Sequence, residues 1–238
     1  MIVSGSLDRS RKERVSTDSG TLHVYRNHIV TSPAGGSPSP QAYLVEQEPN
    51  AVLRTHFHYN SQFQIFVSGT GTLGRKEVRP YVVQYADRQT GYGPITAGIN
   101  GLEYLSLRPT TISQRAQYLP ESRDLLDLKV PKRQVASPPM DVLADAGTYQ
   151  ERTMIEPTAD GLAAWMVHVP RNSRKTAPVL PNGSGRFYVV VSGEMLTTHG
   201  ASKALSVVWV SKEEPPLELR TLEQDLDVII VQFPKDAW

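Results

Sequence analysis

Short runs of apolar and β-branched residues recur along the whole chain. They occupy residues 22–26, 42–47, 51–58, 62–68, 78–85 and 102–108 in the first half, and 148–155, 161–169, 186–192, 204–211, 217–221 and 226–233 in the second. Clusters of Gly, Pro, Asn and Ser separate them, as at 32–40 and 91–101. Short strands at regular spacing, with turn residues between them, predict an all-β sandwich or barrel.

The chain also repeats itself. Residues 62–69 read QFQIFVSG and residues 186–193 read RFYVVVSG, at an offset of 124 (187 − 63). The same offset carries LEYL, which begins at Leu102, onto LDVI, which begins at Leu226. AYLV at 42–45 resembles AWMV at 164–167, at an offset of 122. Three matches at nearly constant spacing indicate two duplicated β domains, since a solenoid would repeat at a much shorter period.

Helical periodicity is confined to the middle of the chain. The best candidate covers 121–128, with apolar residues at 125, 126 and 128, and a weaker one covers 140–146. We therefore predict four segments: an N-terminal arm at 1–19, a first β domain at 20–118, a linker with a few short helices at 119–147, and a second β domain at 148–238.

Composition excludes several classes of function. The chain has 238 residues, 25 Lys and Arg against 24 Asp and Glu, and no cysteine. A net charge of +1 argues against a nucleic-acid partner. The lack of cysteine removes disulfides and thiolate metal sites. We expect no membrane partner, because no apolar run approaches the ~20 residues of a spanning helix. The polar first twenty residues do not resemble a secretory signal, so we expect a cytoplasmic protein.

One hairpin carries the candidate chemistry. His56 and His58 are two residues apart in a strand pattern, so both imidazoles should leave the same face of the sheet. Gln62 and Gln64 repeat this spacing on the next strand, after a turn at 59–61. If that face lines a barrel, two nitrogen donors and a carboxamide converge, which is the first requirement of a metal site.

This hairpin resembles the first motif of the cupin superfamily, small β-barrels that often occur in tandem as bicupins. That motif is a glycine, five residues, His-x-His, three or four residues, a glutamate, six residues and a glycine. Here Asn50 stands at the leading glycine, Gln62 at the glutamate and Gly69 at the final glycine. Glutamine can coordinate a cation through its amide oxygen, but it brings no negative charge.

The second cupin motif runs through Pro-x-Gly to a histidine that supplies the last ligand. The corresponding segment, GYGPITAGING at 91–101, contains Pro94 and Gly98 but no histidine. The fourth ligand of the family is therefore missing. Four side chains nearby could substitute, and the sequence does not select among them: Gln84, Tyr85, Tyr92 and Glu103.

The resemblance implies two cupin-type antiparallel β-barrels (double-stranded β-helix or jelly-roll) in tandem, with the pocket in the first. His56, His58 and Gln62 would hold a divalent metal (Fe, Mn, Ni or Zn). Adding 124 to these positions gives Leu180, Asn182 and Arg186, none of which matches a family ligand. The second barrel should therefore carry no such metal and would serve packing, dimerisation or a lid.

Three functions stay open at this point. The first is a small-molecule enzyme of the cupin type, a dioxygenase, isomerase, lyase or hydrolase, with His56 and His58 as catalytic residues. Its substrate contacts would come from Arg54, Gln64, Phe66 and Tyr92. The second is a metal-free cupin that uses a histidine as general acid or base. The third is a non-catalytic ligand-binding or structural bicupin. The expected partner is a small-molecule substrate or ligand, and a homodimer is compatible with all three functions.

Overall fold

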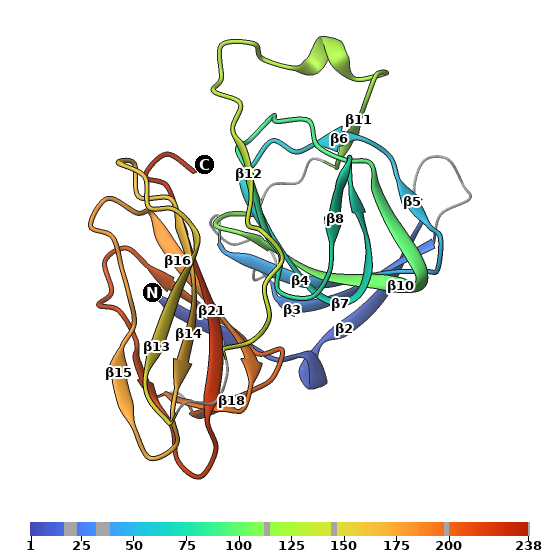
Figure 1. The fold of residues 1–238 in the computed structure, drawn as a ribbon. Coiled ribbons are helices and arrows are strands. Elements are labelled where there is room, and N and C mark those ends of the chain that lie inside the picture. The colour runs from blue at the N-terminus through green and yellow to red at the C-terminus, as the bar shows by residue number, and fades with distance from the viewer. Residues whose placement is uncertain (17–22, 32–38, 112–114, 144–146, 198–199, 238) are drawn as a thin grey trace. The chain divides into compact units, whose positions relative to one another are not determined.

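The computed structural model describes residues 1–16, 23–31, 39–111, 115–143, 147–197 and 200–237 (Figure 1). These residues form strands joined by loops, with two 3-10 helices, η1 (Leu7–Arg9) and η2 (Arg123–Leu125). The all-β prediction is therefore confirmed. Neither described helix has the length and apolar character needed to cross a membrane. The chain divides into two compact units, an N-terminal unit built from Arg11–Met140 and a C-terminal unit built from Asp141–Asp236 together with Met1–Ser10.

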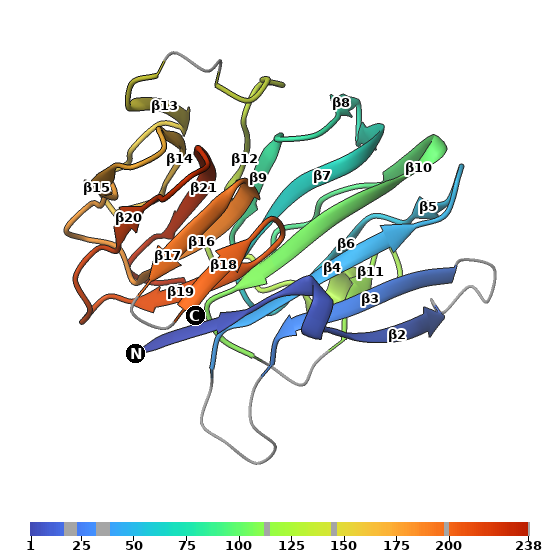
Figure 2. The ribbon, with the colours of Figure 1, turned by 90° about the horizontal axis from the view of Figure 1, so that it is seen from below.

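A nine-stranded antiparallel sheet forms most of the N-terminal unit. Its order is β12-β9-β7-β10-β4-β3-β2, with β5 on β10 and β8 on β7 (Figures 1 and 2). The strands are β2 (Arg11–Ser16), β3 (His23–Val30), β4 (Gln41–Gln47), β5 (Val52–Leu53), β7 (Gln62–Leu73), β8 (Lys76–Val78), β9 (Val83–Ala86), β10 (Ile95–Arg108) and β12 (Gln134–Ala136). A separate pair joins β6 (His56–Phe57) to β11 (Gln117–Tyr118).

Two antiparallel sheets form the C-terminal unit. The first follows the order β1-β19-β16-β21-β14-β13 and the second β15-β20-β17-β18. The strands are β1 (Ile2–Gly5), β13 (Gln150–Ile155), β14 (Ala163–Val169), β15 (Arg174–Thr176), β16 (Gly185–Ser192), β17 (Glu194–Thr197), β18 (Gly200–Lys203), β19 (Val207–Ser211), β20 (Glu218–Arg220) and β21 (Leu226–Phe233).

Strand register reproduces the internal repeat. Ile65 on β7 pairs with Leu105 on β10, and the residues 124 positions later, Val189 on β16 and Ile229 on β21, pair in the same way. The offset of 122 holds as well, because β4 pairs with β10 as β14 pairs with β21. The duplication predicted from short sequence matches is therefore present in the hydrogen-bonded ladders.

The glycine shared by the two repeats has a steric reason in both units. Gly69 and Gly193 have φ angles of 74° and 75°, in the left-handed region that side chains disfavour. A Cβ on Gly69 would lie 2.2 Å from the carbonyl oxygen of Gly101, and one on Gly193 would lie 1.8 Å from that of Asp225. Both glycines let the backbones of neighbouring strands approach closely.

Alternation along β7 and β10 separates two buried faces. One face carries Phe63 and Ile65 on β7, which pair with Leu107 and Leu105 on β10. The other face carries polar groups, among them Gln64, which pairs with Ser106. Toward the other end of this second face the residues become apolar, where Phe66 pairs with Tyr104 in the core cluster of the unit. A strand places alternate residues on opposite faces, so a row of polar side chains lies inside the unit.

Three sequence expectations differ from the structure. Residues 1–19 were expected to form an arm, but β1 joins the C-terminal unit beside β19 and β2 joins the N-terminal unit beside β3. The segment 119–140 groups with the N-terminal unit and contributes β12. Within 121–128 only the three residues of η2 are helical, and 140–143 is not helical, while 144–146 lies outside the described residues. The reason is that so short a helix is unstable without an apolar face to bury, and Leu128 is 86% exposed.

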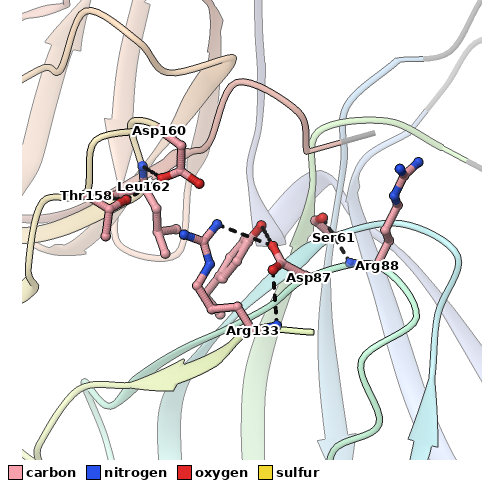
Figure 3. Close-up of polar contacts among 8 residues, drawn as sticks. Ser61, Asp87, Arg88, Arg133, Thr158, Asp160 and Leu162 are labelled. Carbon is pink, nitrogen blue, oxygen red and sulfur yellow. Dashed lines mark hydrogen bonds and ion pairs between the residues drawn. The ribbon is translucent and has the colours of Figure 1, made fainter. Parts of the chain in front are cut away.

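Asp87 holds the strand β12 to the N-terminal unit (Figure 3). Its carboxylate accepts hydrogen bonds from the Tyr85 hydroxyl at 2.6 Å, the Arg133 backbone N–H at 3.1 Å and the Arg133 guanidinium at 3.4 Å. The Asp87 N–H donates in return to the Arg133 carbonyl at 2.9 Å. These bonds explain why this part of the expected linker packs as a strand.

Candidate active site in the N-terminal unit

A cavity of about 440 Å³ lies in the N-terminal unit. Strands β2, β3, β4, β6, β7, β10 and β11 all contribute to its lining. Its polar residues include His56, His58, Gln62, Gln64, Ser106 and Arg108, and its aromatic residues are Tyr43, Tyr92, Tyr104 and Tyr118. This volume is within the range of small-molecule pockets, which are roughly 300–1,000 Å³.

The two histidines meet as the hairpin pattern predicts, although the local structure differs. The segment 51–58 is not one strand but splits into β5 and the two-residue β6. His56 and Tyr92 exchange backbone hydrogen bonds of 3.1 and 3.0 Å, which aligns β6 along the segment before β10. The rings of His56 and His58 lie 5.1 Å apart between centroids, and both line the cavity.

A backbone carbonyl orients the His56 ring. Its Nδ1 lies 2.7 Å from the carbonyl oxygen of Arg54. A carbonyl only accepts hydrogen bonds, so Nδ1 carries the proton and Nε2 is the acceptor in the neutral ring. Burial, together with the charges of Arg108 and Arg26, lowers the pKa of His56 to about 4 against the weaker opposing effect of the Arg54 hydrogen bond. The ring is therefore neutral near pH 7.

Arg108, at the end of β10, is the residue that sequence analysis missed. It is only 7% exposed, and its Nε donates to the Gln62 side-chain oxygen at 3.1 Å. Its Nη2 lies 3.2 and 3.3 Å from the two ring nitrogens of His58. Its position in the strand could have indicated it, because Arg108 follows Tyr104 and Ser106 in the row of alternate residues that lies on the same face as the glutamines.

Both the oxygen and the nitrogen of the Gln62 carboxamide form hydrogen bonds. Its oxygen accepts from Arg108 and, at 3.5 Å, from the Ser106 hydroxyl. Its amide nitrogen donates to the Tyr92 hydroxyl oxygen. Burial raises the pKa of Tyr92, so this hydroxyl keeps its proton. Because the Tyr92 oxygen accepts from Gln62, its own O–H can donate to a bound molecule.

These residues do not fit a divalent cation as they are arranged. The donor atoms that a metal would take from His58 and Gln62 contact the positively charged guanidinium of Arg108. A cation cannot share those lone pairs with a buried guanidinium, and the cluster supplies no carboxylate to offset a second charge. No group of three or more His, Cys, Asp or Glu in the described part of the chain is placed to hold a metal.

Of the four predicted substrate contacts, two line the cavity and two do not. Gln64 and Tyr92 line the cavity, and the side-chain oxygen of Gln64 is buried without a hydrogen-bond partner. Arg54 does not line the cavity. Its side chain pairs with Glu121, and Nη2 lies 2.5 and 2.6 Å from the two carboxylate oxygens. Phe66 does not line it either and packs against Tyr104 at 5.4 Å between ring centroids.

Comparisons with known proteins find likeness in structure alone. No protein-family model and no curated protein matches the chain. A putative dioxygenase from Nostoc punctiforme matches with a TM-score of 0.68 and 8% identity, over 100% of this chain and 84% of that one. Oxalate decarboxylase OxdC from Bacillus subtilis matches with a TM-score of 0.61 and 13% identity, over 98% of this chain and 76% of that one.

A further OxdC structure, which concerns the Mn(II) centers of that enzyme, matches with a TM-score of 0.61 and 12% identity, over 99% of this chain and 78% of that one. At such low identity the likeness establishes the fold and nothing finer. The chain has the bicupin fold, which confirms what the sequence resemblance implied.

Proposed function

We propose that the N-terminal barrel is the active site of a small-molecule enzyme that transfers protons without a divalent metal, with neutral His56 as proton acceptor. The observation that carries this proposal is the Arg108 guanidinium, which contacts His58 and Gln62 where a metal would have to bind.

Two neighbouring groups would share the proton transfer. His56 is neutral, held at Nδ1, and presents Nε2 as acceptor, which is what a general base requires. The Tyr92 ring lies 4.6 Å from the His56 ring between centroids, and its hydroxyl can donate to an oxygen that gains negative charge. An acceptor beside a donor supports removal of a proton next to a carbonyl group, as in isomerases and lyases.

The test measures proton exchange. A panel of small carbonyl and carboxylic compounds is incubated with EDTA-treated protein in D₂O, and ¹H NMR follows the loss of C–H signals. We expect exchange of at least one compound by the wild type, a loss of about 10²-fold or more in His56→Gln and a smaller loss in Tyr92→Phe. Arg75→Gln, an exposed position of the same unit that does not line the cavity, is the control and should keep the wild-type rate.

The metal content of the purified protein tests the main alternative, a metal-dependent enzyme. The fold of OxdC, a protein with Mn(II) centers, favours a metal enzyme in which His56, His58 and Gln62 coordinate the ion after Arg108 moves away. Stoichiometric metal in the purified protein, lost in His56→Ala, would replace our proposal with this one. A wild type that binds small molecules but exchanges no proton in any of them would indicate the non-catalytic bicupin.

A further inference from the structure

The cavity contains a buried positive charge without a counter-charge. Arg108 is 7% exposed, and the acceptors it reaches are all neutral: Gln62, His58 and, at 3.5 Å, Gln41. It forms no ion pair with any residue that the structure describes. Burying an unpaired charge is costly, so buried charges in proteins are normally paired. A ligand that enters the cavity can supply the missing negative charge.

A second guanidinium, that of Arg26, lies near the Tyr43 ring, as the Arg108 guanidinium does. Arg26 and Arg108 both lie over the Tyr43 ring, with 5.2 and 5.4 Å from guanidinium carbon to ring centroid. The Nε of Arg26 is buried and has no hydrogen-bond partner. Burial by itself would raise the pKa of Tyr43, but the charges of Arg108 and Arg26 and a hydrogen bond with Ser106 outweigh it and lower the pKa. The positive potential in this part of the cavity is therefore strong.

The lining as a whole is basic. It includes four arginines, Arg14, Arg26, Arg108 and Arg115, and one carboxylate, Glu13. Glu13 accepts a hydrogen bond from His28 at 3.0 Å and lies opposite Arg26 in the β2–β3 ladder, so its charge acts on Arg26 and leaves Arg108 without a counter-charge. The imidazoles of His56 and His58 are neutral because burial and Arg108 lower the pKa of both. The positive charge of the cavity therefore comes from the arginines.

The rest of the wall is aromatic and aliphatic. Tyr104 and Tyr118 line the cavity together with Val24, Val45 and Leu53. Such a wall suits the apolar body of a ligand whose charged group lies at the arginines. The planar fork of a guanidinium matches a carboxylate, which can accept two parallel hydrogen bonds.

We propose that the cavity binds a small organic carboxylate with an apolar body, and that the buried Arg108 and the partly buried Arg26 hold its carboxylate group. This inference rests on the proposed function in taking the cavity as the active site, and it adds the class of substrate. The carboxylate would lie beside His58 and Gln62, which leaves the adjacent carbon of the ligand toward His56 and Tyr92.

Calorimetric titration of the full chain tests this inference, with EDTA-treated protein at pH 7.5. Benzoate and phenylacetate are the probes, benzamide is the uncharged control of matched shape, and phenyl phosphate tests a different anion. We expect benzoate or phenylacetate to bind at least about tenfold more tightly than benzamide, and phenyl phosphate to bind no more tightly than they do. Arg108→Gln and Arg26→Gln should each weaken carboxylate binding by about tenfold or more.

Arg75→Gln is the matched control, because it removes an exposed arginine of the same unit that does not line the cavity, and it should leave the affinity unchanged. Thermal melting separates binding from folding. Since Arg108 is buried and unpaired, its replacement by glutamine should not lower the melting temperature of the free protein, while it removes the rise caused by benzoate. Arg108→Lys keeps the charge without the fork and should retain part of the affinity.

Several results would overturn the inference. These are equal binding of benzamide and benzoate, tighter binding of phenyl phosphate, no heat of binding for either carboxylate at millimolar concentration, or equal losses in Arg75→Gln and Arg108→Gln. Carboxylate binding that survives His56→Gln but not Arg108→Gln supports the inference even if no proton exchange is found. Stoichiometric metal at His56 would contradict the proposed function, and the calorimetry of EDTA-treated protein would still decide the carboxylate separately.

Discussion

In the N-terminal unit, the polar face of β7 and β10 borders a cavity, whereas the matching face of β16 and β21 in the C-terminal unit belongs to an apolar cluster. Three positions show the change. Tyr43, Gln64 and Ser106 correspond to Trp165, Tyr188 and Ile230, which pack together in that cluster. The ladders have the same register in both units, so the volume and polarity of a few side chains determine which barrel is hollow.

One further exchange separates the two interiors. Gln62 and Arg108 in the N-terminal unit correspond to Arg186 and Gln232 in the C-terminal unit, where the guanidinium and the carboxamide have changed places. Arg186 donates to the Tyr188 hydroxyl at 3.0 Å and to a backbone carbonyl at 2.9 Å. Gln232 bonds only to backbone groups. Arg186 is 4% exposed and, like Arg108, forms no ion pair among the described residues, but it lies in a packed interior, whereas Arg108 lines a cavity that a ligand can enter.

The largest expected effect concerns the glycine that both units share. Gly193→Ala should destabilise the protein by about 4 kcal/mol or more, because a Cβ would lie 1.8 Å from the Asp225 carbonyl oxygen at a left-handed φ. Gly69→Ala should act similarly in the other unit, where the distance is 2.2 Å. Chemical denaturation measures both losses.

Gly147→Ala is the control for this prediction, because Gly147 also has a positive φ but its Cβ would meet no atom of the described residues within 4 Å. It should cost only about 1–2 kcal/mol, the ordinary penalty of a left-handed residue. Equal losses at positions 147 and 193 would show that conformation alone, and not the close strand contact, explains the shared glycine.

The second prediction compares equivalent positions in a filled and a hollow interior. Ile230→Ala should cost about 3 kcal/mol, because Ile230 is fully buried in the apolar cluster and its loss leaves a void. Ser106→Ala should cost about 1 kcal/mol, because it loses a 3.5 Å hydrogen bond to Gln62 and one with Tyr43 at the cavity wall but leaves no void in a packed core. Urea unfolding of each variant measures the difference, and similar losses would contradict the contrast between the interiors.

The third prediction concerns acid. The pKa of His56 is about 4 in the folded protein against 6.5 for an unperturbed histidine, so between these values the unfolded chain binds a proton that the folded chain does not. The stability of the N-terminal unit should therefore fall as the pH drops from 6.5 to 4, by about 3 kcal/mol at most from this residue. Burial lowers the pKa of His58 as well, so this residue acts in the same direction.

Hydrogen–deuterium exchange with peptide resolution measures this loss at pH 7 and pH 4.5, with the C-terminal peptides as internal reference. His56→Gln should reduce the pH dependence of the N-terminal peptides. An equal acid response in both units, or one that His56→Gln leaves unchanged, would contradict the assignment to the buried imidazoles.

The smallest effect is expected for exposed ion pairs, and one pair from each unit gives the comparison. Arg54 and Glu121 are 44% and 61% exposed in their side chains, and Arg174 and Glu218 are 68% and 54% exposed. Exposed pairs contribute little because water screens them and holding two long side chains costs entropy. Arg54→Gln and Arg174→Gln should leave the unfolding free energy unchanged within error. A clear loss for Arg54→Gln would show that its contact with the Tyr118 ring supports the cavity wall.

The duplication and most strands could be predicted because they rest on local patterns, as in the shared segment that ends at Gly69 and Gly193. The histidine pair could be predicted for the same reason, since two residues of separation set a common side of the chain. The split of 51–58 into β5 and β6 could not, because it depends on bonds between His56 and Tyr92, which are 36 residues apart (92 − 56).

By itself, the amino-acid order determined the all-β class, the two copies and the hairpin that carries His56 and His58, since alternation and turn residues act between neighbours in the chain. Tertiary structure alone decided that Arg108 lies against His58 and Gln62, and that Arg54 pairs with Glu121 outside the cavity. Both outcomes depend on strand register and on which groups share a buried space. Contacts between distant parts of the chain set these features, and residue spacing does not encode them directly.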